Sequence, residues 1–449
     1  MPESTGSATI IVMLNASLVR TALMSVVALC ASSAAAQRIE TANVLDDDAV
    51  QVMAAQWTQG SARRTIPPRM AEEFRWPVAR ALALLGVVES IDAEGLDPAD
   101  YHPQDLREAM AGGPGVRLDN VAGAIFTWLA QDLRDGRTPD DARRSYLMDD
   151  PDAERLPIGP LMERALVTGD MAGVLASLNP VLPDYAALRD ALAATPADDT
   201  ERRDAIRANM DRWRWLPRDL GGIHLMVNVP EYRLRLTVNG QVLRNYRTIV
   251  GQPGRNATPQ LSEMVEGVIF NPTWTVPQSI VVGEGLGRRV LNNPNWARAR
   301  GYVATRGANG RVNVVQSPGP GNALGAMKLD MPNPHAIFLH DTPSKQLFDN
   351  DMRALSHGCI RVQDAMELAV VLNLLGQGVS AEEALSISAS GQYTRVPLSM
   401  PVPVYIAYFT MGLDENGSLV EFDDIYDRDA PVVASLGRPS QRQLLLASR

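Results

Sequence analysis

The residues best suited to chemistry lie in the last third of the chain, where LSHGCIRV at 355–362 contains Cys359. The sequence has 2 cysteines, and the other, Cys30, lies near its beginning. A cysteine nucleophile needs a base to accept its proton, a group to orient that base and N–H donors for the oxyanion. His340 precedes Cys359 by 19 residues. We therefore predict a catalytic pair of Cys359 and His340, in which the imidazole lowers the pKa of the thiol.

Two elements must bring this pair together. HAIFLHDTP predicts a strand that ends at His340, and DAMELAVVLNLLG predicts a helix after Cys359. Cys359 then lies in the turn before that helix, and a strand end and a following loop can meet at one edge of a sheet. Gly358 allows the tight turn that would direct main-chain N–H groups at a substrate carbonyl.

Other chemistries fit these residues less well. A buried structural thiol would be poorly served by neighbours such as Ser, His, Gly and Arg. His335, His340, His357 and Cys359 are spaced H-x4-H and H-x-C, which matches no standard zinc pattern, so no metal is expected. Ser356 lacks the Gly-x-Ser-x-Gly setting of a serine nucleophile. His102 and His224 have no ionisable cluster nearby in the sequence.

The segment VRTALMSVVALCASSAAAQ is typical of a secretory signal peptide, with Arg20 first, then an apolar run, then small residues. Cleavage after Ala36 would assign residues 1–36 to the signal, and translation could begin at Met13. A lipoprotein signal through Cys30 is the alternative, although Leu29 stands where a small residue is expected. Loss of the signal leaves Cys359 as the sole thiol of a periplasmic protein, without a disulfide framework.

Charge and hydropathy exclude two classes of partner. The net charge of −10 and the isoelectric point near 5.1 argue against nucleic-acid binding. No later apolar run is long enough to span a membrane, so no transmembrane segment is expected in the mature chain.

The pattern predicts an α+β protein with a helical part first. Residues 37–68 are read as a leader and linker, and 69–218 as a helical scaffold domain. PVARALALLGVVESI and NVAGAIFTWLAQDLRDG have apolar residues three and four apart, and Gly136 is a plausible helix stop. Trp213 and Trp215 are expected to pack at the junction with the next domain. An aromatic ligand platform is the alternative for these rings.

Residues 219–400 form the predicted β-rich catalytic domain. Asn239-Gly240 separates two alternating runs, which is a strong hairpin signal. Residues 279–326 are rich in Gly, Asn and Arg and are interpreted as an insertion capping the sheet rather than a strand pair. Residues 401–449 supply a late strand and a tail that complete this domain.

An ordered series of motifs extends beyond the cysteine turn. HDT at 340–342 and SHGCIRV at 356–362 are accompanied by MDRWRWLP, VNVPEYRLRL, IVGQPGRNATP, IFNPTWTVP and PGPGNALG. This series resembles the L,D-transpeptidases of the YcbB type, whose catalytic domain is called YkuD-like. The resemblance covers roughly residues 75–430. A peptidoglycan-binding module common in that branch has no room between the helical part and the catalytic part.

The resemblance implies a role for each matching residue. The third member of the triad would be the main-chain carbonyl of Asp341, with the Asp341 side chain structural. Main-chain N–H groups of Gly358, Cys359 and His357 would bind the oxyanion. Ser356 and Arg361 would shape the loop or hold substrate. Trp274 would line the cleft. Phe338 stands where some relatives carry a tyrosine.

The implied activity is formation of peptidoglycan crosslinks, of the 3,3 or the 1,3 type, through a Cys359 thioester. Stem peptides would be donor and acceptor, no cofactor would be needed, and carbapenems would acylate the thiol. The same acyl-enzyme could instead serve an L,D-carboxypeptidase or a D-amino-acid exchange enzyme. A cell-wall-binding scaffold with a retired catalytic fold is a third reading, against which the intact Cys359–His340 pair argues.

Overall fold

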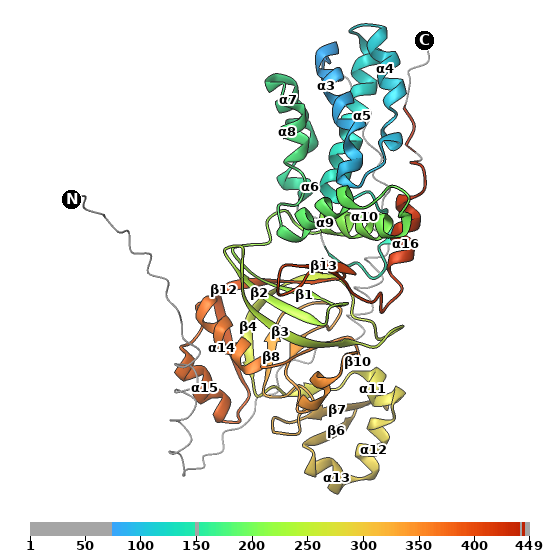
Figure 1. The fold of residues 1–449 in the computed structure, drawn as a ribbon. Helices are drawn as coiled ribbons and strands as arrows, with labels where there is room; N and C mark the ends of the chain where they lie inside the picture. Colours follow the sequence, from blue (N-terminus) through green and yellow to red (C-terminus); the bar gives the residue numbers. More distant parts are fainter. Residues whose placement is uncertain (1–73, 149–151, 441, 445–449) are drawn as a thin grey trace, which may run out of the picture. The chain divides into compact units, whose positions relative to one another are not determined.

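The computed structural model describes residues 74–148, 152–440 and 442–444, drawn in colour in Figure 1. The predicted signal peptide, Cys30 and the leader lie outside the described residues. The chain divides into two compact units, Met1–Ala62 and Arg63–Arg449, and all that follows concerns the second unit.

The first part of the second unit is helical, as predicted. Its helices α3 (Val78–Glu89) and α5 (Val116–Asp135) coincide with the two stretches of helical periodicity, and α5 ends at Gly136. Apolar side chains such as Leu84, Ile125 and Phe126 make one buried core between these helices. The other helices here are α4 (Pro103–Ala111), α6 (Asp152–Arg155), α7 (Ile158–Thr168) and α8 (Met171–Ala176).

Two helices join this part to the sheet. They are α9 (Pro183–Ala194) and α10 (Thr200–Arg214), and the Asp199 side chain caps α10. Trp213 stacks on Phe409 with ring centroids 4.2 Å apart, in a buried cluster that also contains residues of the sheet. Trp215 packs against Val432 of α16 (Asp429–Leu436). The predicted packing of both tryptophans at the junction is confirmed.

The catalytic part is built on a nine-stranded sheet in the order β10-β3-β11-β9-β8-β4-β12-β1-β2. A further pairing of β3 with β2 closes this sheet on itself. The predicted hairpin is present, because β2 and β3 are antiparallel and turn at Asn239-Gly240. The strands are β1 (Ile223–Asn228), β2 (Arg233–Val238), β3 (Gln241–Gly251), β4 (Leu261–Phe270), β8 (Met327–Asp330), β9 (Leu339–His340), β10 (Ala354–Ser356), β11 (Ile360–Val362) and β12 (Thr394–Ala407).

One face of this sheet packs on the predicted helix after the cysteine, α14 (Ala365–Leu375). Leu368 and Leu372 of α14 are buried against strand residues such as Leu329, Leu339 and Ile360. Figure 1 shows α14 and α15 (Ala381–Ala389) lying beside the strands. A small hairpin of β13 (Met411–Leu413) and β14 (Leu419–Glu421) follows the sheet. The expected α+β class is confirmed.

The expectation for residues 279–326 is wrong in one respect. This segment does contain a strand pair, β6 (Tyr302–Arg306) with β7 (Val312–Gln316), joined through a turn at Gly307 and Gly310. Both strands have five residues, and Val314 is buried in a cluster with side chains such as Ile280 and Val290 of the helices in this segment. The sheet is completed by β5 (Trp274–Thr275), and the helices are α11 (Gln278–Gly283), α12 (Leu286–Asn292) and α13 (Pro294–Ala299). We call residues 274–316 the cap (Figure 1).

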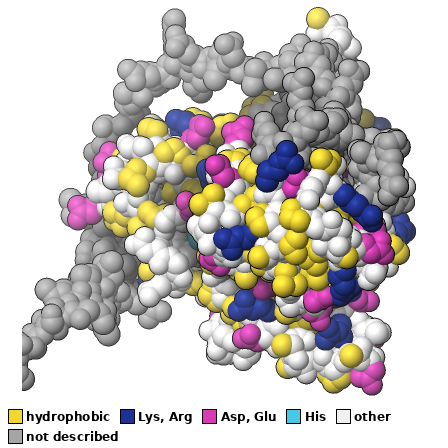
Figure 2. Space-filling model, turned by 90° about the horizontal axis from the view of Figure 1, so that it is seen from above, with side chains coloured by type: hydrophobic (Ala, Val, Ile, Leu, Met, Phe, Trp, Pro, Cys, Tyr) yellow, Lys and Arg dark blue, Asp and Glu magenta, His cyan; other side chains and the backbone are white. Residues whose placement is uncertain are grey.

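On the face shown in Figure 2, acidic and basic side chains are interspersed and do not form an area of a single sign. Hydrophobic side chains gather over part of the same face. Among the described residues, no helix is both long enough and apolar enough to cross a bilayer.

Candidate active site

The predicted base, His340, is fixed by strand register. It ends β9, where it is paired with Lys328 of β8 on one side and Arg361 of β11 on the other. The imidazole is buried, with 4% of its surface exposed. β9 is much shorter than predicted, because the Asn333 side chain accepts from the N–H groups of His335 and Ile337 and so holds a turn there.

The Asp341 main-chain carbonyl orients the imidazole. Its oxygen accepts a hydrogen bond from Nδ1 of His340, which is the contact expected from the resemblance. A proton on Nδ1 leaves the lone pair on Nε2, so Nε2 is the nitrogen that can accept a proton. The Asp341 carboxylate turns away to the N–H of Ala326 at 2.9 Å and to the Lys345 ammonium.

Cys359 sits in a turn between β10 and β11 that is held by Ser356. The buried Ser356 hydroxyl donates to the Cys359 carbonyl and accepts from the Gly358 N–H at 3.1 Å. Gly358 has φ of +118°, a conformation that residues with a Cβ rarely adopt. Cys359 directly precedes β11, and Arg361, two residues later, is the register partner of His340. If strand alternation is continued back by one residue, Cys359 and His340 project from the same face of the sheet.

Thr258, which was not predicted from the sequence, stabilises this turn through its hydroxyl group. Its fully buried hydroxyl donates to the Gly358 carbonyl and accepts from the Gly251 N–H, both at 2.8 Å. The Thr258 carbonyl accepts from Arg428 at 2.9 Å. Thr258 lies about a hundred residues before Gly358, and no local pattern marks the pairing.

The protonation of the pair differs from the prediction. Burial raises the pKa of the Cys359 thiol, and the Phe338 N–H, Lys328 and Arg361 offset this only in part. Burial also lowers the pKa of His340 to about 4, with Arg361 and Lys328 acting in the same direction and the Asp341 carbonyl opposing them. The expected lowering of the thiol pKa is therefore wrong for this state. Both groups are neutral near pH 7, because desolvation outweighs the nearby charges.

The thiol points at another acceptor in this state. Cys359 Sγ lies 3.5 Å from the carbonyl oxygen of Ala336, a residue with φ of +53°. As a residue, Cys359 is half-buried.

His357 points out of the turn toward the cap. Its Nε2 contacts the Glu284 carboxylate, which follows α11, and both side chains are about half exposed. The predicted cleft residue Trp274 lies in β5 and packs partly buried against the core of the cap. The structure thus joins the cap to the catalytic turn through one side-chain contact.

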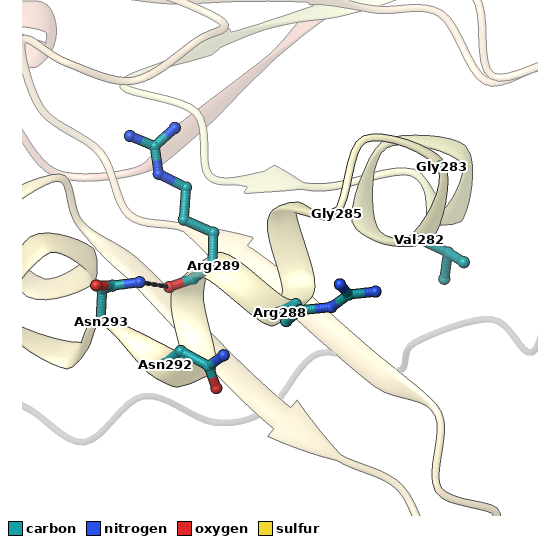
Figure 3. Close-up of a pocket in the computed structure, with 7 residues that line it drawn as sticks. All are labelled: Val282, Gly283, Gly285, Arg288, Arg289, Asn292 and Asn293. Carbon is teal, nitrogen blue, oxygen red and sulfur yellow. Dashed lines mark hydrogen bonds between the residues drawn. The ribbon is translucent and has the colours of Figure 1, made fainter.

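A pocket of about 400 Å³ lies within the cap and is lined by residues between Val282 and Asn293 (Figure 3). In Figure 3 the side chains of Arg288 and Arg289 diverge from α12, and Asn293 donates to the Arg289 carbonyl at 3.0 Å. Its lining includes neither Cys359 nor His340, so we place the chemistry at the turn and not in this hollow.

Phe338 and Arg361 lie next to the pair. The Lys328 ammonium sits 3.4 Å from the centroid of the Phe338 ring, a cation–π contact at the position where some relatives carry a tyrosine. Arg361 is half-buried on β11. Lys328 was also missed from the sequence, although a signal existed: of the 42 basic side chains only Lys328 and Lys345 are lysines.

Comparison with known families decides what this arrangement belongs to. Residues 222–397 match the sequence model described as the L,D-transpeptidase catalytic domain. Residues 222–397 are thus identified as an L,D-transpeptidase catalytic domain. Residues 72–192 of the chain match a second model, described as a Scaffold domain. Both matched segments agree with the expected helical and β-rich parts.

A relative in Haemophilus influenzae carries the name "Putative L,D-transpeptidase". It is 32% identical over 243 residues, which are 51% of this chain and 48% of the relative. The chain thus matches only about half the length of that relative.

Two solved structures share a weak likeness with part of this chain. One is the Ldtfm–avibactam carbamoyl enzyme, at 13% identity and a TM-score of 0.22, covering 43% of this chain and 51% of that one. Another, from Mycobacterium smegmatis, has 13% identity and a TM-score of 0.22, covering 41% of this chain and 58% of that one.

The histidines and Cys359 are also side chains that could bind a metal ion. Within residues 74–148, 152–440 and 442–444, no group of three or more His, Cys, Asp or Glu side chains is arranged to hold a metal ion.

Proposed function

We propose that this protein is a periplasmic L,D-transpeptidase that crosslinks peptidoglycan stem peptides through a thioester on Cys359. The observation that carries the proposal is the hydrogen bond from His340 Nδ1 to the Asp341 carbonyl, on a histidine that shares a sheet face with Cys359. This contact leaves Nε2 as the base.

In the first step, the Cys359 sulfur attacks a carbonyl carbon of the donor stem peptide while its proton passes to Nε2 of His340. Because thiol and imidazole are both neutral at rest, attack and proton transfer proceed together. A carbon–sulfur bond forms, the amide carbon–nitrogen bond breaks, and the imidazolium returns its proton to the leaving amine. An amine of a second stem peptide then attacks the thioester: a new amide carbon–nitrogen bond forms, the carbon–sulfur bond breaks, and the proton lost by the amine passes through Nε2 of His340 to the Cys359 sulfur.

Main-chain N–H groups of the turn would bind the oxyanion. The Gly358 N–H is occupied by the Ser356 hydroxyl, so it can contribute only after leaving that contact. The N–H groups of Cys359 and His357 are therefore the donors that we assign, and removal of such a donor typically costs about 3 kcal/mol of transition-state stabilisation.

Product analysis tests the proposal. Purified protein is incubated with defined muropeptides that carry tetrapeptide or pentapeptide stems, and products are separated and sequenced by mass spectrometry. We expect crosslinked dimers that the Cys359→Ala variant does not form, and the linkage in the dimers distinguishes 3,3 from 1,3 crosslinks. Absence of any product that depends on Cys359 would reject an enzymatic role.

The same assay separates the alternatives. Trimmed monomers without dimers would indicate an L,D-carboxypeptidase, and incorporation of a labelled D-amino acid would indicate exchange. Intact-mass analysis after carbapenem treatment should show an adduct on Cys359, which tests the acylation step by itself. Export is tested by fractionating cells that produce the full chain.

A further inference from the structure

A row of three basic side chains crosses the active-site face. Lys328 on β8 is the register partner of His340 on β9, and His340 is the register partner of Arg361 on β11. Register partners on neighbouring strands project their side chains from the same face. His340 therefore has one cation on each neighbouring strand, Lys328 on β8 and Arg361 on β11.

Within the part of the chain that the structure describes, neither Lys328 nor Arg361 has an ion-pair partner at contact distance, and the only carboxylate that acts on Lys328 is Asp330, two residues along β8. The nearby acids are committed elsewhere, because Asp330 pairs with Arg395 at 2.5 Å and Asp341 pairs with Lys345. Two half-buried positive charges without an ion pair are costly to hold together, which favours a site that is completed by an anion.

The choice of lysine supports a defined contact. In a chain that uses arginine for nearly every basic position, Lys328 provides a compact ammonium seated on the Phe338 ring, while Arg361 provides a planar fork. An ammonium and a guanidinium together suit a carboxylate, which can accept from both.

The position of this pair identifies which carboxylate. Under the proposed function, His340 returns its proton to the leaving amine, so the leaving nitrogen lies at the middle of the row. In an α-amino acid the carboxylate is separated from that nitrogen by one carbon. A single leaving amino acid therefore brings its own carboxylate within reach of a flanking cation.

We propose that Lys328 and Arg361 form a carboxylate subsite that binds the free α-carboxylate of the leaving amino acid beside His340. The subsite holds the amine against Nε2 and favours a donor that ends one residue after the scissile bond. By microscopic reversibility, a free amino acid can enter the same subsite and attack the thioester, whereas its amide lacks the recognised group.

The test compares two donors that differ only in this group. One stem peptide ends in a free carboxylate and the other ends in the corresponding carboxamide. We expect Lys328→Met to lower kcat/KM for the acid donor about ten- to a hundredfold more than for the amide donor, the usual effect of losing a charge-assisted hydrogen bond. Any loss common to both donors reports the effect of Lys328 on Cys359 and His340. Lys328→Arg should restore part of the preference for the acid.

A control removes a positive charge away from the row. Arg244 of β3 pairs with Glu367 of α14. Arg244→Met should leave kcat/KM unchanged for both donors. Arg361→Gln tests the second cation and keeps the inference testable if Lys328→Met does not fold. An equal loss of kcat/KM for the acid and amide donors, together with a shift in the pH profile of Cys359 alkylation by iodoacetamide, would mean that Lys328 acts on the thiol. That result would overturn the carboxylate subsite.

Binding separates this inference from the proposed function on which it rests. Calorimetry with the Cys359→Ala variant measures the affinity of both donors without turnover. Tighter binding of the acid that disappears with Lys328→Met supports the subsite even if no crosslink is ever formed. Equal binding of acid and amide to the Cys359→Ala protein would refute it.

Discussion

The two halves of the candidate site are held in different ways. His340 is fixed by the sheet, since register pairs it with Lys328 and Arg361 and burial excludes water. Cys359 is fixed by a turn whose shape depends on two hydroxyl groups, those of Ser356 and Thr258. The base is thus positioned by backbone pairing, which tolerates many side chains, and the nucleophile by side-chain contacts, which tolerate few.

The largest effect should come from the base itself. His340→Gln keeps a side chain of similar length in the strand but removes the proton acceptor, so kcat should fall about a thousandfold, within the range for general base catalysis. The stability of the sheet should change little, because register is set by the backbone. Steady-state kinetics with thermal unfolding as the control checks both, and an activity loss below tenfold would contradict the role of His340.

The turn should be most sensitive at Thr258. Thr258→Val keeps the shape but leaves the Gly251 N–H and the Gly358 carbonyl without their partner, which costs about 1–3 kcal/mol in a buried site. We expect lower stability and roughly a tenfold loss in the rate of Cys359 alkylation. Thr258→Ser retains the hydroxyl and is the matched control, so equal behaviour of both variants would show that the hydroxyl is not needed.

The pH dependence should report the base and the nucleophile separately. Only the neutral imidazole accepts a proton, and burial holds the pKa of His340 at about 4, so kcat/KM should be flat down to about pH 5 and fall tenfold per unit below pH 4. Alkylation of Cys359 in the free enzyme should rise at higher pH than for an exposed cysteine, because burial raises the pKa of the thiol. An acid limb near pH 6.5 would show that His340 is not desolvated in solution.

The smallest effect is expected at the contact between turn and cap. Glu284→Gln removes the charge that faces His357, and both side chains are about half exposed. The KM for stem peptides should change by no more than about threefold, as is usual for exposed ion pairs, and the change should vanish in high salt. A larger change in kcat than in KM would mean that the cap acts on the chemistry.

The sequence was sufficient for the parts of the site that are local. Cys359, Gly358 and Ser356 are neighbours in the chain, and the Asp341 carbonyl follows His340 directly, so their proximity needed no knowledge of the sheet. Thr258 and Lys328 could not be found in this way. Their contacts depend on which strands pair and in what register, and the order β3-β11-β9-β8 is not readable from alternation alone.

Electrostatics was the other point that the sequence could not supply. A histidine near a cysteine suggested a thiolate, yet the balance between desolvation and charge depends on how deeply both groups lie. The strand pair of the cap was not predicted either. The five-residue segments β6 and β7 cannot be distinguished from loops before their pairing is known.

A hydrogen-bonded route connects the helical part to the nucleophile. Arg212 of α10 donates to the Arg428 carbonyl at 3.0 Å, Arg428 donates to the Thr258 carbonyl, and Thr258 donates to the Gly358 carbonyl. An excised version that begins after α10 would keep every catalytic residue and lose the first link of this route. A chimaera that joins the β-rich part to an unrelated N-terminal domain should therefore be less active, unless that domain supplies an equivalent of Arg212.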